Sequence, residues 1–139
     1  MKKTEHTSAI DIKTLKKELV ILHRKEIEAH FTKDVDFLLK NVSSDFMSVN
    51  GGKISFPSVE EMRESFTLYL DNTEFSKYVD LCDPIIGFSG DGSIAWSTVQ
   101  VRVEGKSSDD VIAFTCAWIT LYKRKEDRWI KFTEVSSFG

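Results

Sequence analysis

The chain has 139 residues, 41% of them hydrophobic, and a formal net charge of −3, which is the composition of one folded domain. Lysine and arginine together number 19 against 22 aspartates and glutamates, so no basic surplus is available for binding nucleic acid. The apolar stretches are too short to span a bilayer, and the polar N-terminus lacks the apolar segment of a signal peptide. We therefore expect a cytoplasmic protein with a single domain over residues 1–139 and no membrane partner.

The first part of the chain has the residue spacing of helices. Residues 1–10 carry no pattern and are expected to be flexible. From Ile12 the apolar residues recur at intervals of three and four, which predicts an amphipathic helix that ends near Phe31. A second, shorter helix is predicted over residues 33–39.

A short hairpin and a capped helix are predicted next. Strands over 43–49 and 54–56 flank an Asn-Gly-Gly turn, a combination typical of a tight hairpin. Ser58 and Glu61 form a capping box, because each side chain can accept a hydrogen bond from a free backbone N–H of the helix start. This predicts a third helix over 59–70.

From residue 75 onward the apolar residues alternate with a period of two, which is typical of strands. The predicted strands cover residues 75–89, 93–104, 110–123 and 128–138. Short connections rich in Gly, Ser and Asp predict hairpins and therefore an antiparallel sheet. Helices followed by a meander of strands indicate the α+β fold class.

The turns determine which side chains share a face of the sheet. A last turn centred on residues 126–127 pairs Ile119 with Glu134, and paired residues point to the same side. A preceding turn centred on residues 106–107 places the even-numbered residues of the strand over 93–104 on the same side of the sheet as Ile119 and Glu134. This face of the sheet combines apolar side chains with a few polar ones, as the wall of a binding pocket does. Together with Tyr69 of the third helix, it forms the expected ligand-binding site, which consists of Tyr69, Trp96, Thr98, Gln100, Thr115, Glu134 and Ser136.

The other face of the sheet is aliphatic and aromatic, with Val99, Val101, Val103, Phe114 and Trp118. Three helices can cover only one face of a sheet, so an apolar second face needs another partner. We expect a homodimer in which this aliphatic sheet face packs against a second copy of the chain.

Several short motifs occur in a characteristic order between residues 12 and 138. They are Lys33-Asp34-Val35-Asp36, Ser44-Asp45-Phe46 before Asn50-Gly51-Gly52, the helix Val59–Leu70, Asp127-Arg128-Trp129 and Ser136-Ser137-Phe138. Their order resembles the nuclear-transport-factor-2-like (NTF2-like) superfamily, in its SnoaL-like and ketosteroid-isomerase-like branch. The resemblance implies a cone-shaped α+β barrel, in which three N-terminal helices wrap a curved antiparallel sheet around an internal pocket. It also implies homodimers packed through the sheet.

The resemblance further implies where catalytic groups would lie. Isomerase-like members carry a carboxylate base after the first strand, where this chain has Asn50, an amide that cannot accept a proton from carbon. The paired histidines of other members correspond to Thr133 and Val135. The acid that donates to an oxyanion corresponds to Trp118 or Ile119. The standard catalytic residues are therefore absent, and no catalytic residue is assigned.

Three functions remain open on this basis. The first is a SnoaL-like protein that binds a small apolar molecule in an internal pocket. The second is an isomerase, cyclase or dehydratase that uses Glu134 or Asp45 as its acid or base, since burial would raise a carboxyl pKa. The third is an oligomerisation module. No cofactor is implied, and no metal site is expected, because His23 and His30 lie two helical turns apart.

Overall fold

The computed structural model describes residues 2–139, with side chains described from residue 12 onward. The helices of this part are α1 (Lys2–Thr32), α2 (Val35–Leu39) and α3 (Val59–Asp71). The strands are β1 (Val42–Asn50), β2 (Lys53–Ser55), β3 (Thr73–Asp80), β4 (Ile85–Phe88), β5 (Ile94–Ser107), β6 (Asp110–Lys125) and β7 (Arg128–Phe138). The predicted α+β class is confirmed. No helix in the searched part of the chain is long and apolar enough to cross a membrane.

Two element boundaries differ from those predicted. Helix α1 begins at Lys2 instead of Ile12, while Met1 lies outside the described residues, so the flexibility expected for residues 1–10 stays a prediction. The single strand predicted over 75–89 is two strands, β3 and β4, separated by a segment that contains Pro84. Proline has no N–H to donate to a strand ladder, which favours a break at this point.

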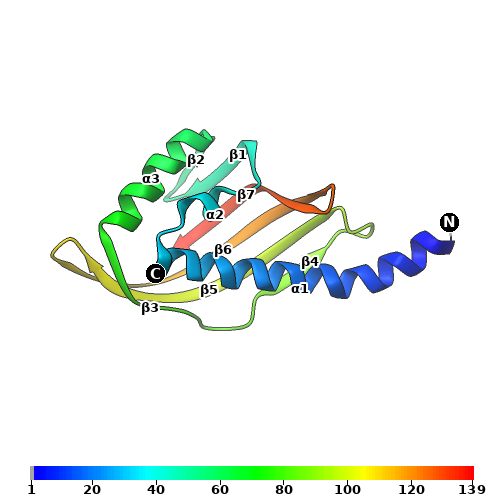
Figure 1. Ribbon diagram of the computed structural model, residues 1–139, viewed down its shortest axis with the longest axis horizontal. Helices are drawn as coiled ribbons and strands as arrows, with labels where there is room; N and C mark the ends of the chain where they lie inside the picture. Colours follow the sequence, from blue (N-terminus) through cyan, green and yellow to red (C-terminus); the bar gives the residue numbers. More distant parts are fainter. Residues whose placement is uncertain (1) are drawn as a thin grey trace.

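The seven strands form one curved sheet in the order β2-β1-β7-β6-β5-β3, with β4 also paired to β5. The pairs along β5, β6 and β7 are antiparallel, as predicted, but β1 runs parallel to β7. The sheet is therefore mixed, and the prediction of a wholly antiparallel sheet is wrong. It is also not closed into a complete barrel, and α1 lies along its concave side (Figure 1).

The core lies between α1 and the inner face of this sheet. Leu19 of α1 packs with Ala95 and Tyr122, and further along the helix Ile27 packs against Val101 and Val103. The two valines belong to the aliphatic face that was predicted to form a dimer. This prediction is wrong for that face, because the helices cover it and leave the opposite face exposed.

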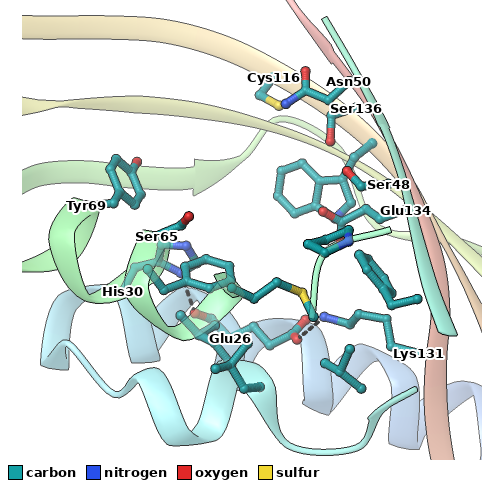
Figure 2. Close-up of a pocket in the computed structure, with 18 of the residues that line it drawn as sticks. Glu26, His30, Ser48, Asn50, Ser65, Tyr69, Cys116, Lys131, Glu134 and Ser136 are labelled. Atoms are coloured by element: carbon teal, nitrogen blue, oxygen red, sulfur yellow. Dashed lines mark hydrogen bonds and ion pairs between the residues drawn. The ribbon is translucent and has the colours of Figure 1, made fainter. Parts of the chain in front are cut away.

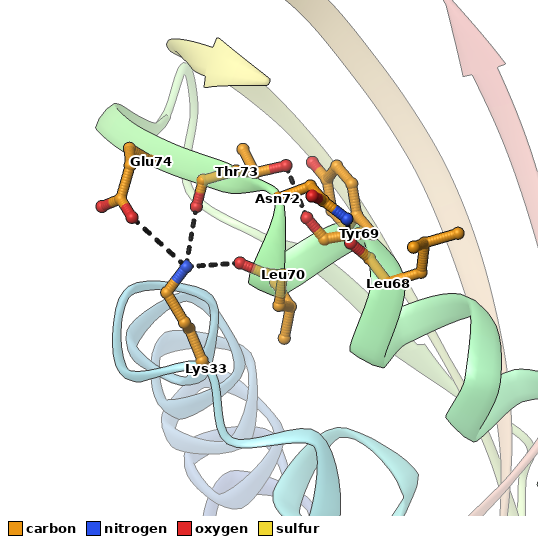
Figure 3. A network of polar contacts seen from close by, with 7 residues as sticks. All are labelled: Lys33, Leu68, Tyr69, Leu70, Asn72, Thr73 and Glu74. Carbon is orange, nitrogen blue, oxygen red and sulfur yellow. Dashed lines mark hydrogen bonds and ion pairs between the residues drawn. The ribbon is translucent and has the colours of Figure 1, made fainter. Parts of the chain in front are cut away.

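Helix α3 is attached to the end of α1 by one lysine. Lys33 follows α1 in the left-handed conformation, with φ of 59°, so that its side chain turns toward the end of α3. Its Nζ donates to the carbonyl oxygens of Leu70 at 2.5 Å and Thr73 at 3.0 Å, and Glu74 lies at 3.5 Å (Figure 3). Because helix carbonyls at a C-terminus lack internal donors, Lys33 satisfies one of them and fixes α3 across the sheet.

The outer face of the sheet carries one continuous row of directly paired side chains that crosses six strands. From β2 to β4 the row consists of Ile54, Val49, Val135, Ile119, Thr98 and Ile85. Trp96 lies beside it across Gly87 of β4, where an added Cβ would come within 2.3 Å of the indole ring. Soluble monomers rarely expose a large apolar surface, so this face is the one available for a second copy. The homodimer itself stays a prediction.

We expect Val135→Lys to shift a dimer toward the 15.9 kDa monomer, because it introduces a charge into the centre of the outer row. The matched control is Val59→Lys at the start of α3, since Val135 and Val59 are 38% and 36% exposed. Sedimentation velocity at micromolar concentration measures both. A wild type that sediments only as a monomer would contradict the homodimer.

Candidate functional site

A cavity of about 940 Å³ lies between the inner face of the sheet and the three helices (Figure 2). This volume is in the range of small-molecule binding sites. Its lining is largely apolar and contains eight aromatic residues, which are Phe46, Phe56, Phe66, Tyr69, Tyr78, Phe114, Trp118 and Phe138. The cavity can therefore enclose a molecule with a mainly hydrophobic body.

An ion pair lies in the wall of this cavity. Nζ of Lys131 on β7 donates to Oε2 of Glu26 on α1 at 2.8 Å, and both side chains are largely buried. Burial by itself lowers a lysine pKa, but the charges of Glu26, Tyr122 and Glu134, together with the hydrogen bond to Glu26, outweigh it and raise the pKa of Lys131 above its usual 10.5. Lys131 is therefore a permanent cation whose charge Glu26 balances.

Glu134 of β7 supplies a second carboxyl group to the cavity (Figure 2). Its Oε2 accepts a hydrogen bond from Oγ1 of Thr120 at 3.3 Å. Among the described residues no ion pair reaches Glu134. Burial raises the pKa of Glu134 above its usual 4.5, an effect that Lys131 opposes. Burial thus favours the protonated form of Glu134 relative to a carboxyl group in water.

A β-bulge places Lys131 and Glu134 on the same face. Residues three apart in a regular strand point to opposite sides of the sheet. In β7, Lys131 pairs with Tyr122 and Thr133 pairs with Leu121, so Phe132 is an additional residue without a partner in the register. The bulge inverts the side-chain alternation beyond this point, and both charged side chains face α1.

Two histidines of α1 also line the cavity. Nε2 of His23 lies 2.6 Å from Oδ1 of Asp80 on β3. Nδ1 of His30 donates to the carbonyl oxygen of Glu26 at 2.7 Å, which leaves Nε2 as the acceptor of that ring. Burial lowers the pKa of His30 below 6.5, so this ring is neutral at pH 7.

Sequence reasoning missed the charged and polar residues of α1. They continue the apolar stripe of that helix, because Leu19, His23, Glu26 and His30 follow at steps of four, three and four. Polar residues in such a stripe face the interior of the protein. This pattern was a signal for a polar interior site.

The structure separates the seven predicted ligand-binding residues into two groups. Three of them line the cavity: Tyr69, Glu134 and Ser136. The other four lie outside the cavity on the opposite face: Trp96, Thr98, Gln100 and Thr115. The expected pairing of Ile119 with Glu134 is wrong by one residue, because Ile119 pairs with Val135 beyond the bulge. A ligand contact of any of the seven stays a prediction.

Two further sequence candidates lie at or beyond the edge of the site. Asp45 is exposed and does not line the cavity, and a hydrogen bond from Ser43 lowers its pKa. The expectation that Asp45 could act as an acid or base inside the pocket is therefore wrong. Asn50 does line the cavity, from the exposed end of β1. Among the residues searched, no three His, Cys, Asp or Glu side chains are grouped to hold a metal ion.

Comparison with known proteins identifies the fold. No family model matches the chain, and no curated protein matches it. Solved structures do match. A candidate dehydratase of the NTF2-like family from Streptomyces avermitilis has a TM-score of 0.73 at 15% identity, over 90% of this chain and 96% of that one. The chain therefore has the NTF2-like fold, as the sequence motifs predicted.

Two other structures with this fold carry different names. A candidate ketosteroid isomerase from Shewanella frigidimarina has a TM-score of 0.64 at 16% identity, over 84% of this chain and 91% of that one. A candidate calcium/calmodulin-dependent kinase II association domain from Exiguobacterium sibiricum has a TM-score of 0.69 at 13% identity, over 87% and 90%. The shared fold thus occurs in proteins named as enzymes and as an association domain, and function depends on the site.

We expect the stability of the wild type to fall, relative to Glu134→Gln, as the pH rises above 4.5. A carboxyl whose pKa is raised by folding contributes its stability below the unfolded pKa and loses it as the pH rises through the folded pKa. The difference should grow by at most about 1.4 kcal/mol per pH unit and then level off. Urea unfolding between pH 4 and 9 measures it.

The matched control is Glu28→Gln, which removes the same charge from an exposed position on α1. Its stability relative to the wild type should change little over the same pH range. A Glu134→Gln profile parallel to that of the wild type would show that burial does not shift the ionisation of Glu134.

Proposed function

We propose that the protein binds a small, largely apolar molecule in the cavity between the sheet and its helices, with Glu134 as the polar anchor. The observation that carries this proposal is a carboxyl group with one side-chain donor, Thr120, in an otherwise mainly apolar cavity of about 940 Å³. A buried polar group with unused hydrogen-bonding capacity costs free energy unless water or a ligand satisfies it. Glu134 therefore gives the cavity a defined point of attachment.

The exposed aromatic side chains at the edge of the cavity support the same function. Phe56 and Phe138 belong to its lining, yet 69% and 58% of their surfaces are exposed. Tyr69, on α3, is half-exposed and also lines the cavity (Figure 2). Apolar surface that is both exposed and part of a cavity wall is typical of a binding site, because a ligand removes it from water.

We expect Ser65→Trp to weaken the binding of a neutral fluorescent dye such as Nile red at least tenfold. Ser65 lines the cavity from α3 and is exposed, so an indole at this position fills ligand space with little cost in stability. Thr67→Trp is the matched control, since Thr67 is exposed on the same helix and does not line the cavity. Equal dye affinity in both variants, or no dye binding by the wild type, would contradict the proposal.

A second candidate function is acid–base catalysis of the isomerase, cyclase or dehydratase kind. The raised pKa of Glu134 favours it, because a general acid or base is most effective when its pKa is near the working pH. His30 is neutral in the same cavity and presents an unprotonated Nε2 as a possible proton acceptor. The dehydratase and isomerase names of similar structures are compatible with this chemistry, but their low identities support the fold only.

If this second function holds, the wild type should isomerise a β,γ-unsaturated ketone to its conjugated form, which ultraviolet absorbance detects. Glu134→Gln should reduce kcat by roughly 100-fold or more, the usual effect of losing a general acid or base. Turnover that Glu134→Gln leaves unchanged would exclude Glu134 as the catalytic group.

The third candidate function is that of an oligomerisation module. The apolar row on the outer face supports it, as does the name of the similar kinase association domain. This function does not require the cavity. Two results would together favour ligand binding over assembly. The first is dye binding that Ser65→Trp weakens, and the second is a wild type that sediments as a monomer.

A further inference from the structure

The charged groups of the cavity are not balanced. Its lining includes three carboxyl groups, those of Glu26, Glu61 and Glu134, and one ammonium group, that of Lys131. Glu26 is paired with Lys131 at 2.8 Å. Glu61 accepts a hydrogen bond from the backbone N–H of Ser58 at 2.9 Å and belongs to the capping box of α3. Glu134 forms no ion pair among the described residues, so the group of Glu26, Lys131 and Glu134 holds two carboxyl groups against one ammonium group.

The surroundings of Glu134 are aromatic and uncharged on the side of β6. Glu134 pairs with Thr120, and Trp118 is two residues before Thr120 on the same face. Diagonal neighbours of this kind lie close enough for large side chains to contact a shared ligand. Trp118 itself lines the cavity and is partly buried. A carboxylate and an indole ring in the wall of one cavity can together attract an organic cation, through charge and cation–π interaction.

We propose that the cavity binds an organic cation, an amine or quaternary ammonium group on an apolar body, with its positive charge between Glu134 and Trp118. This inference rests on the proposed binding function and adds the charge of the ligand. A cation supplies the partner that Glu134 lacks, and ligand binding would favour the ionised carboxylate over the protonated form. Lys131 acts on both carboxyl groups, but its ion pair is with Glu26, so one negative charge of the cluster is left for a cationic ligand to balance.

Three ligands that share one apolar body test the sign of the charge: 4-phenylbutylamine, 4-phenylbutan-1-ol and 4-phenylbutanoate. At pH 8 we expect the amine to bind at least tenfold more tightly than the alcohol, and the carboxylate to bind most weakly. Isothermal titration calorimetry measures all three. Glu134→Gln should remove the preference for the amine, so that this variant binds the amine and the alcohol with affinities within about twofold of each other. Glu28→Gln is the control for the loss of one surface charge.

The pH dependence of binding is a second readout. The amine should bind more tightly as the pH rises through the pKa of Glu134, because only the carboxylate pairs with it, whereas the alcohol should show little change. Other groups that face this part of the cavity could also titrate. They are His23, Glu26 and His30 from α1, Tyr78 from β3, Cys116 from β6 and Lys131 from the same strand, with Tyr69 and Glu61 on α3. Loss of the pH dependence in Glu134→Gln assigns it to Glu134.

The possible failures are distinguishable. If the alcohol or the carboxylate binds as tightly as the amine, the inference of a cation is wrong while the binding cavity stands. A pH dependence that persists in Glu134→Gln also overturns the inference, since another titratable group would then carry it. If no member of the series binds and Nile red does not bind, the proposed function fails together with this inference. If Glu134→Gln does not fold, the wild-type series and its pH profile still decide.

Discussion

One additional residue in the last strand determines the chemistry of the interior. Phe132 interrupts the register between β6 and β7, so that Lys131 and Glu134 both face α1 although they are three residues apart. In a regular strand one of these charges would lie on the outer face. The bulge therefore brings an ammonium and a carboxyl group into the same cavity, and Glu26 of α1 completes the ionic cluster.

The same bulge determines which side chains of β7 lie on each face of the sheet. Its inner face combines the valines of β5 with Trp118 and Glu134, and the helices enclose it. Its outer face retains an apolar row that no helix among the described residues covers. A shift of one residue exchanges the faces of a whole strand segment, so the position of the bulge decides whether a carboxyl is in the cavity or on the surface.

Much of the fold follows from local sequence patterns. The period of the apolar residues predicted α1 and α3, and the capping box at Ser58 marks the start of α3. Both long hairpins were predicted, including the last turn, where Lys125 pairs with Arg128. The turn between β5 and β6 lies two residues later than expected, at Ser107 and Asp110. The pairing between the two strands therefore differs from the expected one by an even number of residues. Because side chains alternate between the faces of a sheet, each side chain stays on the face that was predicted relative to its partner strand.

The site was less predictable because it depends on interactions between distant segments. A bulge depends on how the strand packs, and nothing in the local pattern around Phe132 signals one. Glu134 and Ser136 were assigned to a cavity, although with the wrong neighbours, since alternation was extended through the bulge. The parallel pairing of β1 with β7 is also a long-range feature, and a meander of hairpins does not indicate it.

The charged groups of the interior differ in what they require from their surroundings. Glu26 and Lys131 satisfy each other, so their pair is compatible with a closed and empty cavity. Glu134 has one hydroxyl donor and no ion pair among the described residues, and burial raises its pKa, so its carboxylate form is less favourable here than in water. The large core along α1 and β5 supplies stability elsewhere, which allows the fold to tolerate this local cost. A positively charged occupant would favour the carboxylate form of Glu134, which is the form that burial disfavours.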